Sequence, residues 1–376
     1  MRRRMISTWF FVCACAAPSF AQDDAAATPG RAAAMLNWAE TRMGAGVSAP
    51  DGLYPELGGF IAGSGISIGP GYRRHVFGDR MIVDASAAVA WRGSRMAQSQ
   101  IEWPSLIGHR TSVGVDIKYH DFTGVDFFGV GADSRRSDRA PYRLAYIDVG
   151  GFATVRPTAW LSISGRAGSL ERTAATVTPE PNYVHADVAI EADTRDVPGY
   201  PSSGGRYRFS GAAFHDRELS RSSFRRFEGE AAHYLPVSAR SVVALRGRVD
   251  LSQTSVGQDV PFYLLPALGG RNSLRGYDDY RFRDRDAAMV NAELRTRLFG
   301  SLDGTIFYEA GSVAPSMRAL AKGSLKTDYG AGLRIRARRH LLVRLDVARG
   351  SEGLQSVVSF TPSLGFAKRI AAPYVP

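Results

Sequence analysis

Strict alternation of side-chain type is the feature that most limits the folds this chain can adopt. Between Lys326 and Arg338, alternate residues read Thr, Tyr, Ala, Leu, Ile and Ala, and the residues between them are only Lys, Asp, Gly and Arg. The same period of two recurs near 239–252, 286–299 and 340–350. Successive side chains of a β-strand point to opposite faces, so each segment predicts a strand with one apolar and one charged face.

The charged faces favour a barrel over a sandwich. A soluble sandwich would also alternate, with its charged face in water, but here the charged faces carry both signs in strand after strand. Alternating segments of about ten residues are the sequence form of a transmembrane barrel, apolar toward lipid and polar toward the lumen. Closure also gives every backbone group the partner that lipid demands. With 40 glycines and 10% aromatic residues, we predict an all-β fold, a transmembrane antiparallel β-barrel.

The number of strands follows from counting and from topology. Ten candidate strands, the first near 59–69, precede a long connection at roughly 253–285, and five follow it. A bacterial single-chain barrel has an even number of strands, and an odd number must precede an extracellular loop when both termini are periplasmic. We therefore predict about 16 strands, with the missing one in the first two thirds and 121–131 as its candidate. Aromatic residues near strand ends suit interfacial girdles, and the candidates are Trp91, Trp103, Trp160, Tyr234 and Phe299.

The ends of the chain are expected to lie outside the barrel. Arginines at 2–4, an apolar run from Met5 to Ala17 and a small-x-small site ending at Ala21 form the pattern of a secretory signal peptide. The segment after it either forms a short helix or stays a frayed leader. The predicted organisation is a cleaved signal peptide at 1–21, a periplasmic N-terminal segment at 22–56, an outer-membrane barrel of Gram-negative type at 57–370 and a tail at 371–376.

Composition argues against several classes of function. Both cysteines, Cys13 and Cys15, lie in the predicted leader, so the mature chain has no disulfide and no thiol metal site. Surplus arginine in a polar lumen explains the formal charge of +11, and nucleic-acid binding does not suit an exported chain. The Gly-x-Ser-x-Gly pattern at 65–69 lies in an alternating segment that no helix follows, unlike a nucleophile elbow. The seven histidines show no paired metal spacing. We predict no enzyme, no metal site, no nucleic-acid partner and no small-molecule cofactor.

The stretch "GGRNSLRGY", Gly269–Tyr277, lies in the connection at 253–285, and a connection of this length is either functional or disordered. Its end resembles a loop tip of the BamA/TamA outer-membrane assembly-factor family, the bacterial surface antigen family. A strand with an aromatic-x-acid-x-Gly pattern and an Asp-x-Arg-Asp turn followed by Pro-x-x-Gly are similar to the same family. The matching residues are Leu274, Arg275, Gly276 and Tyr277 in the tip, Phe307, Glu309 and Gly311 in the strand, and Asp193, Arg195, Asp196, Pro201 and Gly204 in the turn.

The resemblance implies a lid, an extracellular loop that folds back into the barrel. It implies a role in the assembly, insertion or translocation of proteins or lipids at the outer membrane, without covalent chemistry. The expected partners are outer-membrane lipids and unfolded outer-membrane or exported proteins. The predicted segment at 22–56 is too short for a POTRA domain, so the chain is expected to be a short member without POTRA domains.

Alternation alone suggests what the lid would meet. Within 303–313, Phe307, Glu309 and Gly311 belong to the lumen-facing set, and Asp328 faces inward on the next strand. A guanidinium suits a lid because it pairs with carboxylates bidentately and stays charged. We expect Arg275 to pair with Glu309 and Asp328, with Gly276 allowing close approach to the wall. The alternative is an exposed loop with a solvated arginine.

Two other hypotheses stay open. A first strand rich in glycine and Pro362 in the last strand suggest a weakly paired seam that opens sideways, because glycine weakens strands and proline removes a ladder donor. The alternative function is a passive, anion-preferring outer-membrane channel, since residues such as Arg246 and Arg334 fall on the lumen face. Large, steady conductance would identify such a channel.

Overall fold

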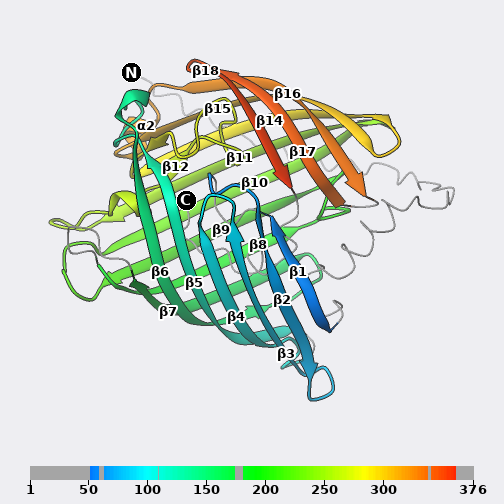
Figure 1. Cartoon of the computed structure of the whole chain (residues 1–376), viewed down its shortest axis with the longest axis vertical. Helices are drawn as coiled ribbons and strands as arrows, with labels where there is room; N and C mark the ends of the chain where they lie inside the picture. Colours follow the sequence, from blue (N-terminus) through cyan, green and yellow to red (C-terminus); the bar gives the residue numbers. More distant parts are fainter. Residues whose placement is uncertain (1–50, 59–62, 109, 174–180, 338–339, 361–376) are drawn as a thin grey trace, which may run out of the picture.

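The computed structural model describes residues 51–58, 63–108, 110–173, 181–337 and 340–360. Its main body is one antiparallel sheet of 16 strands, ordered as they occur in the chain (Figure 1). β1 and β18 are the two ends of this order. The strands are β1 (Gly52–Gly58), β2 (Ser67–Val76), β3 (Met81–Ala90), β4 (Arg95–Trp103), β5 (Thr111–Phe127), β6 (Ala140–Val155), β7 (Leu161–Arg172), β8 (Tyr183–Asp193), β9 (Gly204–Asp216), β10 (Phe224–Ser238), β11 (Ser241–Thr254), β14 (Asp286–Phe299), β15 (Leu302–Ala314), β16 (Lys326–Ala337), β17 (His340–Gly350) and β18 (Gly353–Phe360).

The remaining elements are short and lie in connections. They are the 3₁₀ turns η1 (Arg136–Asp138) and η2 (Phe262–Leu264), the strand pair β12 (Ala267–Leu268) and β13 (Phe282–Arg283), and the helix α2 (Met317–Leu320). No helix in the described ranges is long and apolar enough to cross a membrane.

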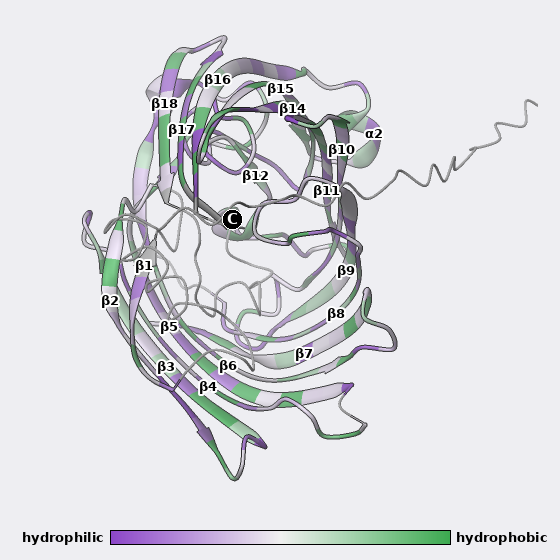
Figure 2. Cartoon of the chain, turned by 90° about the vertical axis from the view of Figure 1, so that its right-hand side faces the viewer, coloured by the Kyte–Doolittle hydropathy of each residue, from purple (hydrophilic) through white to green (hydrophobic). Residues whose placement is uncertain are grey.

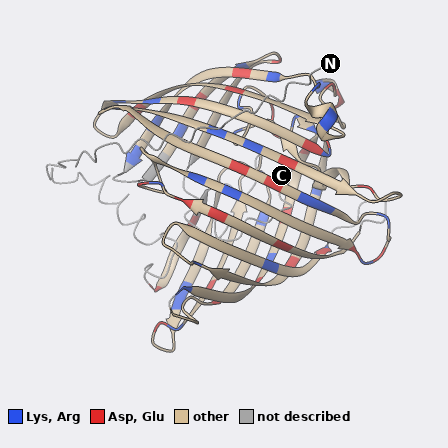
Figure 3. Cartoon of the chain, turned by 180° about the vertical axis from the view of Figure 1, so that it is seen from behind, with Lys and Arg blue, Asp and Glu red and all other residues tan. Residues whose placement is uncertain are grey.

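The alternation in the sequence separates the two faces of the wall. On β15, Ile306 and Tyr308 are 60% and 51% exposed, whereas Phe307 and Glu309 between them are 5% and 3% exposed. Hydrophobic and hydrophilic residues interchange along the strands (Figure 2), and residues of both charges recur on strand after strand (Figure 3). The prediction of an all-β antiparallel barrel of about 16 strands is confirmed, with eleven strands before the long connection.

Two details of the strand prediction are wrong. The additional strand is β1 (Gly52–Gly58), so the sheet begins before residue 57 and before the first strand expected near 59–69. Pro55 breaks the alternating signal there, and an end strand is a place where a sheet tolerates proline. The segment 121–131 adds no strand, because its first part continues β5 past a bulge between Phe122 and Val125.

Four of the five girdle candidates lie on the outside near strand ends. Trp91, Trp103, Trp160 and Phe299 are exposed. Tyr234 is not one of them, because it faces the lumen, where the guanidinium carbon of Arg295 lies 5.2 Å from its ring centroid. The alternation puts Tyr234 in the inward set of β10, and its place near a strand end misled the prediction.

The long connection between β11 and β14, residues 255–285, is the lid of the barrel. It contains η2, β12 and β13, and Figure 2 shows β12 inside the ring of strands. Two buried apolar clusters fix it to the wall on opposite sides. One joins lid residues Val260, Tyr263, Leu264, Leu265 and Tyr280 to inward residues of β5–β10, and the other joins Leu268, Leu274, Tyr277 and Phe282 to Ala287, Met289 and Val313.

Candidate functional site in the barrel lumen

Arg275, near the tip of the lid, is held by three carboxylates of the barrel wall. Its backbone N–H and its Nε donate to the two carboxylate oxygens of Glu309 at 2.7 and 2.8 Å. One terminal nitrogen donates to Glu293 Oε2 at 3.0 Å and to Asp346 Oδ2 at 3.1 Å. Its guanidinium carbon lies 3.3 Å from the centroid of the Phe307 ring, so a cation–π contact adds to the ion pairs. One lid residue therefore ties together β14, β15 and β17.

The three carboxylates that bind Arg275 are matched in number by guanidinium groups. Arg334 donates to Asp346 at 2.6 Å and to Glu293 at 3.2 Å, and Arg344 donates to Asp346. Three guanidinium groups therefore face three carboxylates. Burial lowers the pKa of Arg275, but the carboxylates of Glu309, Glu293 and Asp346 outweigh burial and hold that pKa above its ordinary value. A cation is thus the stable form of the lid tip, and its removal would leave one excess negative charge in the wall.

The residues beside Arg275 fit the wall closely. Leu274 is fully buried in the apolar cluster with Met289. A Cβ on Gly276 would lie 2.6 Å from Asp328 Cβ and 2.7 Å from the backbone nitrogen of Gly350, so a side chain has no room. Tyr277 donates its hydroxyl to the carbonyl of Thr327 at 3.0 Å. The tip therefore occupies one defined position against β15–β17.

The wall also leaves space for the lid at Gly311. A Cβ on Gly311 would lie 2.9 Å from Leu268 Cδ1, so this position on β15 accommodates β12 of the lid. The structure therefore brings Leu274, Arg275, Gly276, Tyr277, Phe307, Glu309 and Gly311 together, as the sequence analysis expects.

The expected partner Asp328 is only a neighbour. It lies opposite Glu309 in the register of β15 and β16, and its Cβ lies next to Gly276. Within the described ranges, however, no ion pair joins Asp328 to Arg275. The partners that the sequence analysis missed are Glu293 and Asp346. Both fall on the charged faces of their alternating segments, which was the available signal. Only the register and the path of the lid bring them to one arginine.

The turn motif forms a compact structure at the end of the barrel opposite the lid's connection. Asp193 binds Arg195 through two contacts of 2.8 and 2.6 Å. Asp196 accepts hydrogen bonds from the backbone nitrogens of Val197, Ser202 and Ser203 at 2.8, 2.9 and 3.2 Å. Gly204 has a φ of +84°, and a Cβ there would collide with the carbonyl of Thr194. The motif therefore specifies the shape of the turn between β8 and β9.

This turn reaches across the lumen to β14. Arg295 donates to the carbonyl of Pro201 at 2.7 Å, and its guanidinium carbon lies 4.6 Å from the centroid of the Tyr200 ring. Arg295 belongs to the same inward set of β14 as Glu293, which binds Arg275. The lid tip and the turn motif are thus anchored two residues apart on one strand, which the sequence did not indicate.

Further contacts hold the outer part of the lid. Arg281 binds Glu352 at 2.7 Å and donates to the carbonyl of Ser134 at 2.6 Å. At the rim, Arg136 in η1 pairs with Asp278 at 2.6 Å. Burial raises the pKa of Asp279 above its ordinary value, although Arg271 partly opposes this. Burial also raises the pKa of Asp284, so the lid carries two acids that burial disfavours in their ionised form.

Several predictions fall where they cannot be compared with the structure. The predicted signal peptide, the candidate helix before residue 50, Pro362 and the tail at 371–376 lie outside the described residues. Ser67 of the Gly-x-Ser-x-Gly pattern begins β2, with no helix after it. The described part of the chain has no group of three or more His, Cys, Asp or Glu side chains arranged to hold a metal ion.

A family model, the Omp85 superfamily domain, matches residues 160–352, which contain the turn motif, the lid and all the wall residues that hold Arg275. No curated protein sequence gives a significant match.

The chain is similar in fold to several solved barrels. BamA from Haemophilus ducreyi lacking POTRA domains 1–3 has a TM-score of 0.62 at 14% identity, over 83% of this chain and 71% of that chain. CdiB from Acinetobacter baumannii has a TM-score of 0.52 at 14% identity, over 78% of this chain and 55% of that chain. CdiB from Escherichia coli has a TM-score of 0.53 at 12% identity, over 82% and 60% respectively.

Proposed function

The chain belongs to the Omp85 superfamily, and from that premise we propose that this outer-membrane barrel assembles, inserts or translocates proteins or lipids without covalent chemistry. Its partners are outer-membrane lipids and unfolded outer-membrane or exported proteins. The observation that carries the proposal is the docking of Arg275 among Glu309, Glu293 and Asp346 inside the lumen.

A lid of this construction suits a barrel that must open in a controlled way. The apolar clusters stabilise the lid in proportion to the apolar area that they bury. The ion pairs of Arg275, in contrast, form only when the lid lies at one register and one depth in the barrel. Buried ion pairs add little net stability but can specify a unique arrangement, because any other position leaves charges unpaired. The docked lid is then one of two states, and a client shifts the balance only by binding the open state better.

The seam between β1 and β18 is the proposed exit toward the membrane. These strands are the two ends of the strand order, and β1 contains Pro55, which cannot donate to a neighbouring strand. Cysteine pairs that cross-link β1 to β18 test this step. A locked seam should abolish activity, and full activity of the locked barrel would refute lateral opening.

The second candidate is a passive, anion-preferring channel. Arg206, Arg208 and Arg246 line the lumen and are about a third exposed at most. Their guanidinium groups pair with Glu191 and Glu230, which offset two of the three positive charges. With the lid also inside the barrel, we expect small and irregular conductance in planar bilayers, and a large steady anion-selective current would favour the channel.

The test of the function is the outer-membrane proteome of a strain depleted of this protein, with its principal assembly factor intact. A broad fall in barrel proteins is expected for an auxiliary insertase, and selective loss of one or two proteins for a dedicated exporter. An unchanged proteome, together with steady anion-selective conductance, would overturn the proposal.

A further inference from the structure

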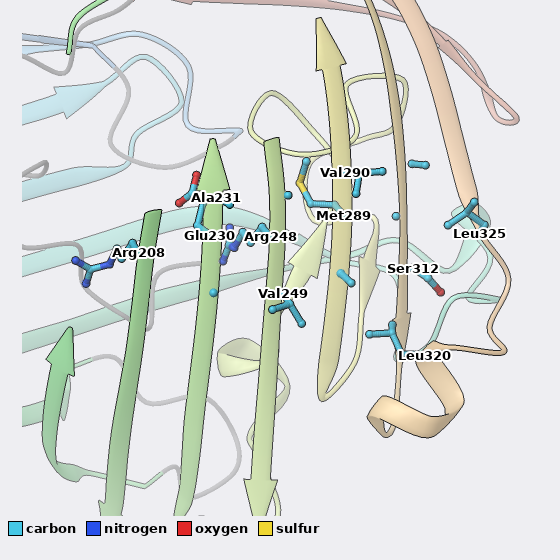
Figure 4. A pocket seen from close by; sticks show the side chains of 15 residues that line it. Arg208, Glu230, Ala231, Arg248, Val249, Met289, Val290, Ser312, Leu320 and Leu325 are labelled. Atoms are coloured by element: carbon cyan, nitrogen blue, oxygen red, sulfur yellow. The ribbon is translucent and has the colours of Figure 1, made fainter. Parts of the chain in front are cut away.

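A groove runs along the outward face of the wall, beneath α2 and the segment that follows it. Its cavity volume is about 580 Å³. Leu320 and Leu325 overhang it from the connection between β15 and β16, and Val249, Val290 and Ser312 flank it on the strands (Figure 4). Val290 shares its face with the exposed apolar residues of the barrel, so the groove opens toward the membrane and not into the lumen.

The groove exists because outward side chains are small at adjacent positions of β10, β11, β14 and β15. Gly229, Ala231, Gly247, Ala288 and Ala310 line it, whereas the outward faces of the same strands also carry large residues such as Phe227, Leu245 and Tyr308. At Gly247 an added Cβ would meet nothing closer than the Met289 carbonyl oxygen at 3.9 Å, so a larger side chain fits the backbone. The sheet does not need glycine there, and a concave apolar surface results.

The roof of the groove, which is the connection 315–325 between β15 and β16, is held in place by polar contacts. Ser312 on the outward face of β15 donates to the carbonyl of Ser324 at 3.1 Å, and Ser316 caps α2 by accepting from the Ala319 nitrogen at 3.3 Å. Ala310 and Ser312 are only 5% and 6% exposed as a result. Hydrogen bonds therefore fix the segment that covers the groove to the wall.

Cations without an acidic partner lie on the elements that form the groove. Arg318 and Lys322, on the roof segment beside Leu320, are exposed, and so is Arg225 on the outward face of β10. None of the described residues forms an ion pair or a side-chain hydrogen bond with these three cations. The nearby carboxylate of Asp286, on the outward face of β14, is buried and accepts a hydrogen bond from the Ser252 nitrogen at 3.0 Å.

We propose that this groove binds an acyl chain of a phosphate-bearing lipid, whose head group meets Arg318, Lys322 and Arg225. An apolar groove on the membrane face with basic residues at its rim matches an anionic amphiphile in both parts. A second copy of the chain fits less well, because a two-fold contact would bring the same cations together. The proposal rests on the barrel spanning a membrane and is independent of its role in assembly.

The test fills the groove without altering the fold. Gly247→Leu places a side chain in the groove, and Gly151→Leu is the matched control on the outward face of β6, where an added Cβ meets only the Gly114 carbonyl oxygen at 3.7 Å. Native mass spectrometry of the folded barrels measures binding of diphosphorylated lipid A and of dioleoylphosphatidylcholine. We expect one tightly bound lipid A on the wild type and on Gly151→Leu, and at least tenfold weaker binding to Gly247→Leu.

The cations are tested separately in the double variant Arg318→Gln/Lys322→Gln. Binding of lipid A should fall about fivefold for each cation removed, while phosphatidylcholine binding stays unchanged. Arg240→Gln, in the turn at the opposite end of the barrel, is the control. Equal lipid A binding by Gly247→Leu and the wild type would overturn the proposal. A dimer mass that Gly247→Leu alone abolishes would also overturn it, in favour of a self-association surface.

Discussion

Replacing Arg275 with alanine should release the lid while leaving the barrel folded. The substitution removes side-chain contacts with Glu309, Glu293 and Asp346 and the stacking on Phe307. Three carboxylates then face only the two guanidinium groups of Arg334 and Arg344. Breaking a buried ion pair by removing one partner costs about 3–5 kcal/mol. The loss cannot exceed the free energy with which the lid docks, because an undocked lid no longer contacts the site.

Trypsin provides the assay, because it cleaves after arginine and the lid carries several. Arg281 and Arg283 are 2% and 0% exposed, so cleavage after them requires the lid to open. A cost of about 3–5 kcal/mol corresponds to opening that is about a hundred to several thousand times more frequent. We expect cleavage of the lid in Arg275→Ala to accelerate by that factor in the refolded barrel in lipid vesicles, up to the limit set by an open loop.

Arg136→Ala is the matched control for this experiment. It also removes an arginine that pairs with an acid of the lid, Asp278, but half of its side chain is exposed. An exposed pair contributes about 0–1 kcal/mol, so cleavage should change by less than about fivefold. Equal protection of the lid in the wild type, Arg136→Ala and Arg275→Ala would refute the view that Arg275 holds the lid.

Three further predictions use the same protease assay, with urea unfolding in lipid as a second readout. Glu309→Gln should destabilise the docked lid by about 1.5–3 kcal/mol, because charged hydrogen bonds become neutral ones, and its effect should be less than additive with that of Arg275→Ala; full additivity would contradict the pairing. Gly276→Ala should displace the tip at a cost of about 1–3 kcal/mol, since the added methyl overlaps Asp328 and Gly350; an unchanged cleavage rate would show that the tip is looser than described. Burial raises the pKa of Asp279, so the folded state binds the proton of this carboxyl more tightly than the unfolded state does. The contribution of Asp279 to the stability of the docked lid is therefore complete below its unfolded pKa of about 3.9, and it is lost as the pH rises through the folded-state pKa. Asp279→Asn should therefore protect the lid more than the wild type does at neutral pH and remove this part of the pH dependence; equal pH profiles of the two proteins would refute it.

The sequence alone predicted the barrel because lipid and lumen impose opposite demands on neighbouring side chains. That alternation placed Glu309 and Phe307 inward on one strand and Glu293 and Asp346 inward on two others. It could not say which acids meet, because a lid residue can reach any inward side chain at its depth. Register decides this, and register depends on bulges such as the one in β5 that the pattern does not reveal.

The failures have equally physical reasons. β1 was missed because Pro55 and its neighbours do not alternate, which an end strand tolerates and an interior strand would not. The contact between Arg295 and Pro201 was missed because a turn of ten residues carries no periodic signal. The groove under α2 was missed because small outward residues look like ordinary irregularity until the neighbouring strands are in register.

The most direct test of the account is rescue of the depleted strain by single-residue variants, read out as the abundance of other outer-membrane proteins. We predict that the wild type and Arg136→Ala restore the proteome, and that Arg275→Ala reaches the outer membrane in equal amount but does not restore it. Full rescue by Arg275→Ala, with its lid shown to be open by trypsin, would contradict the central claim that docking of Arg275 is part of the function.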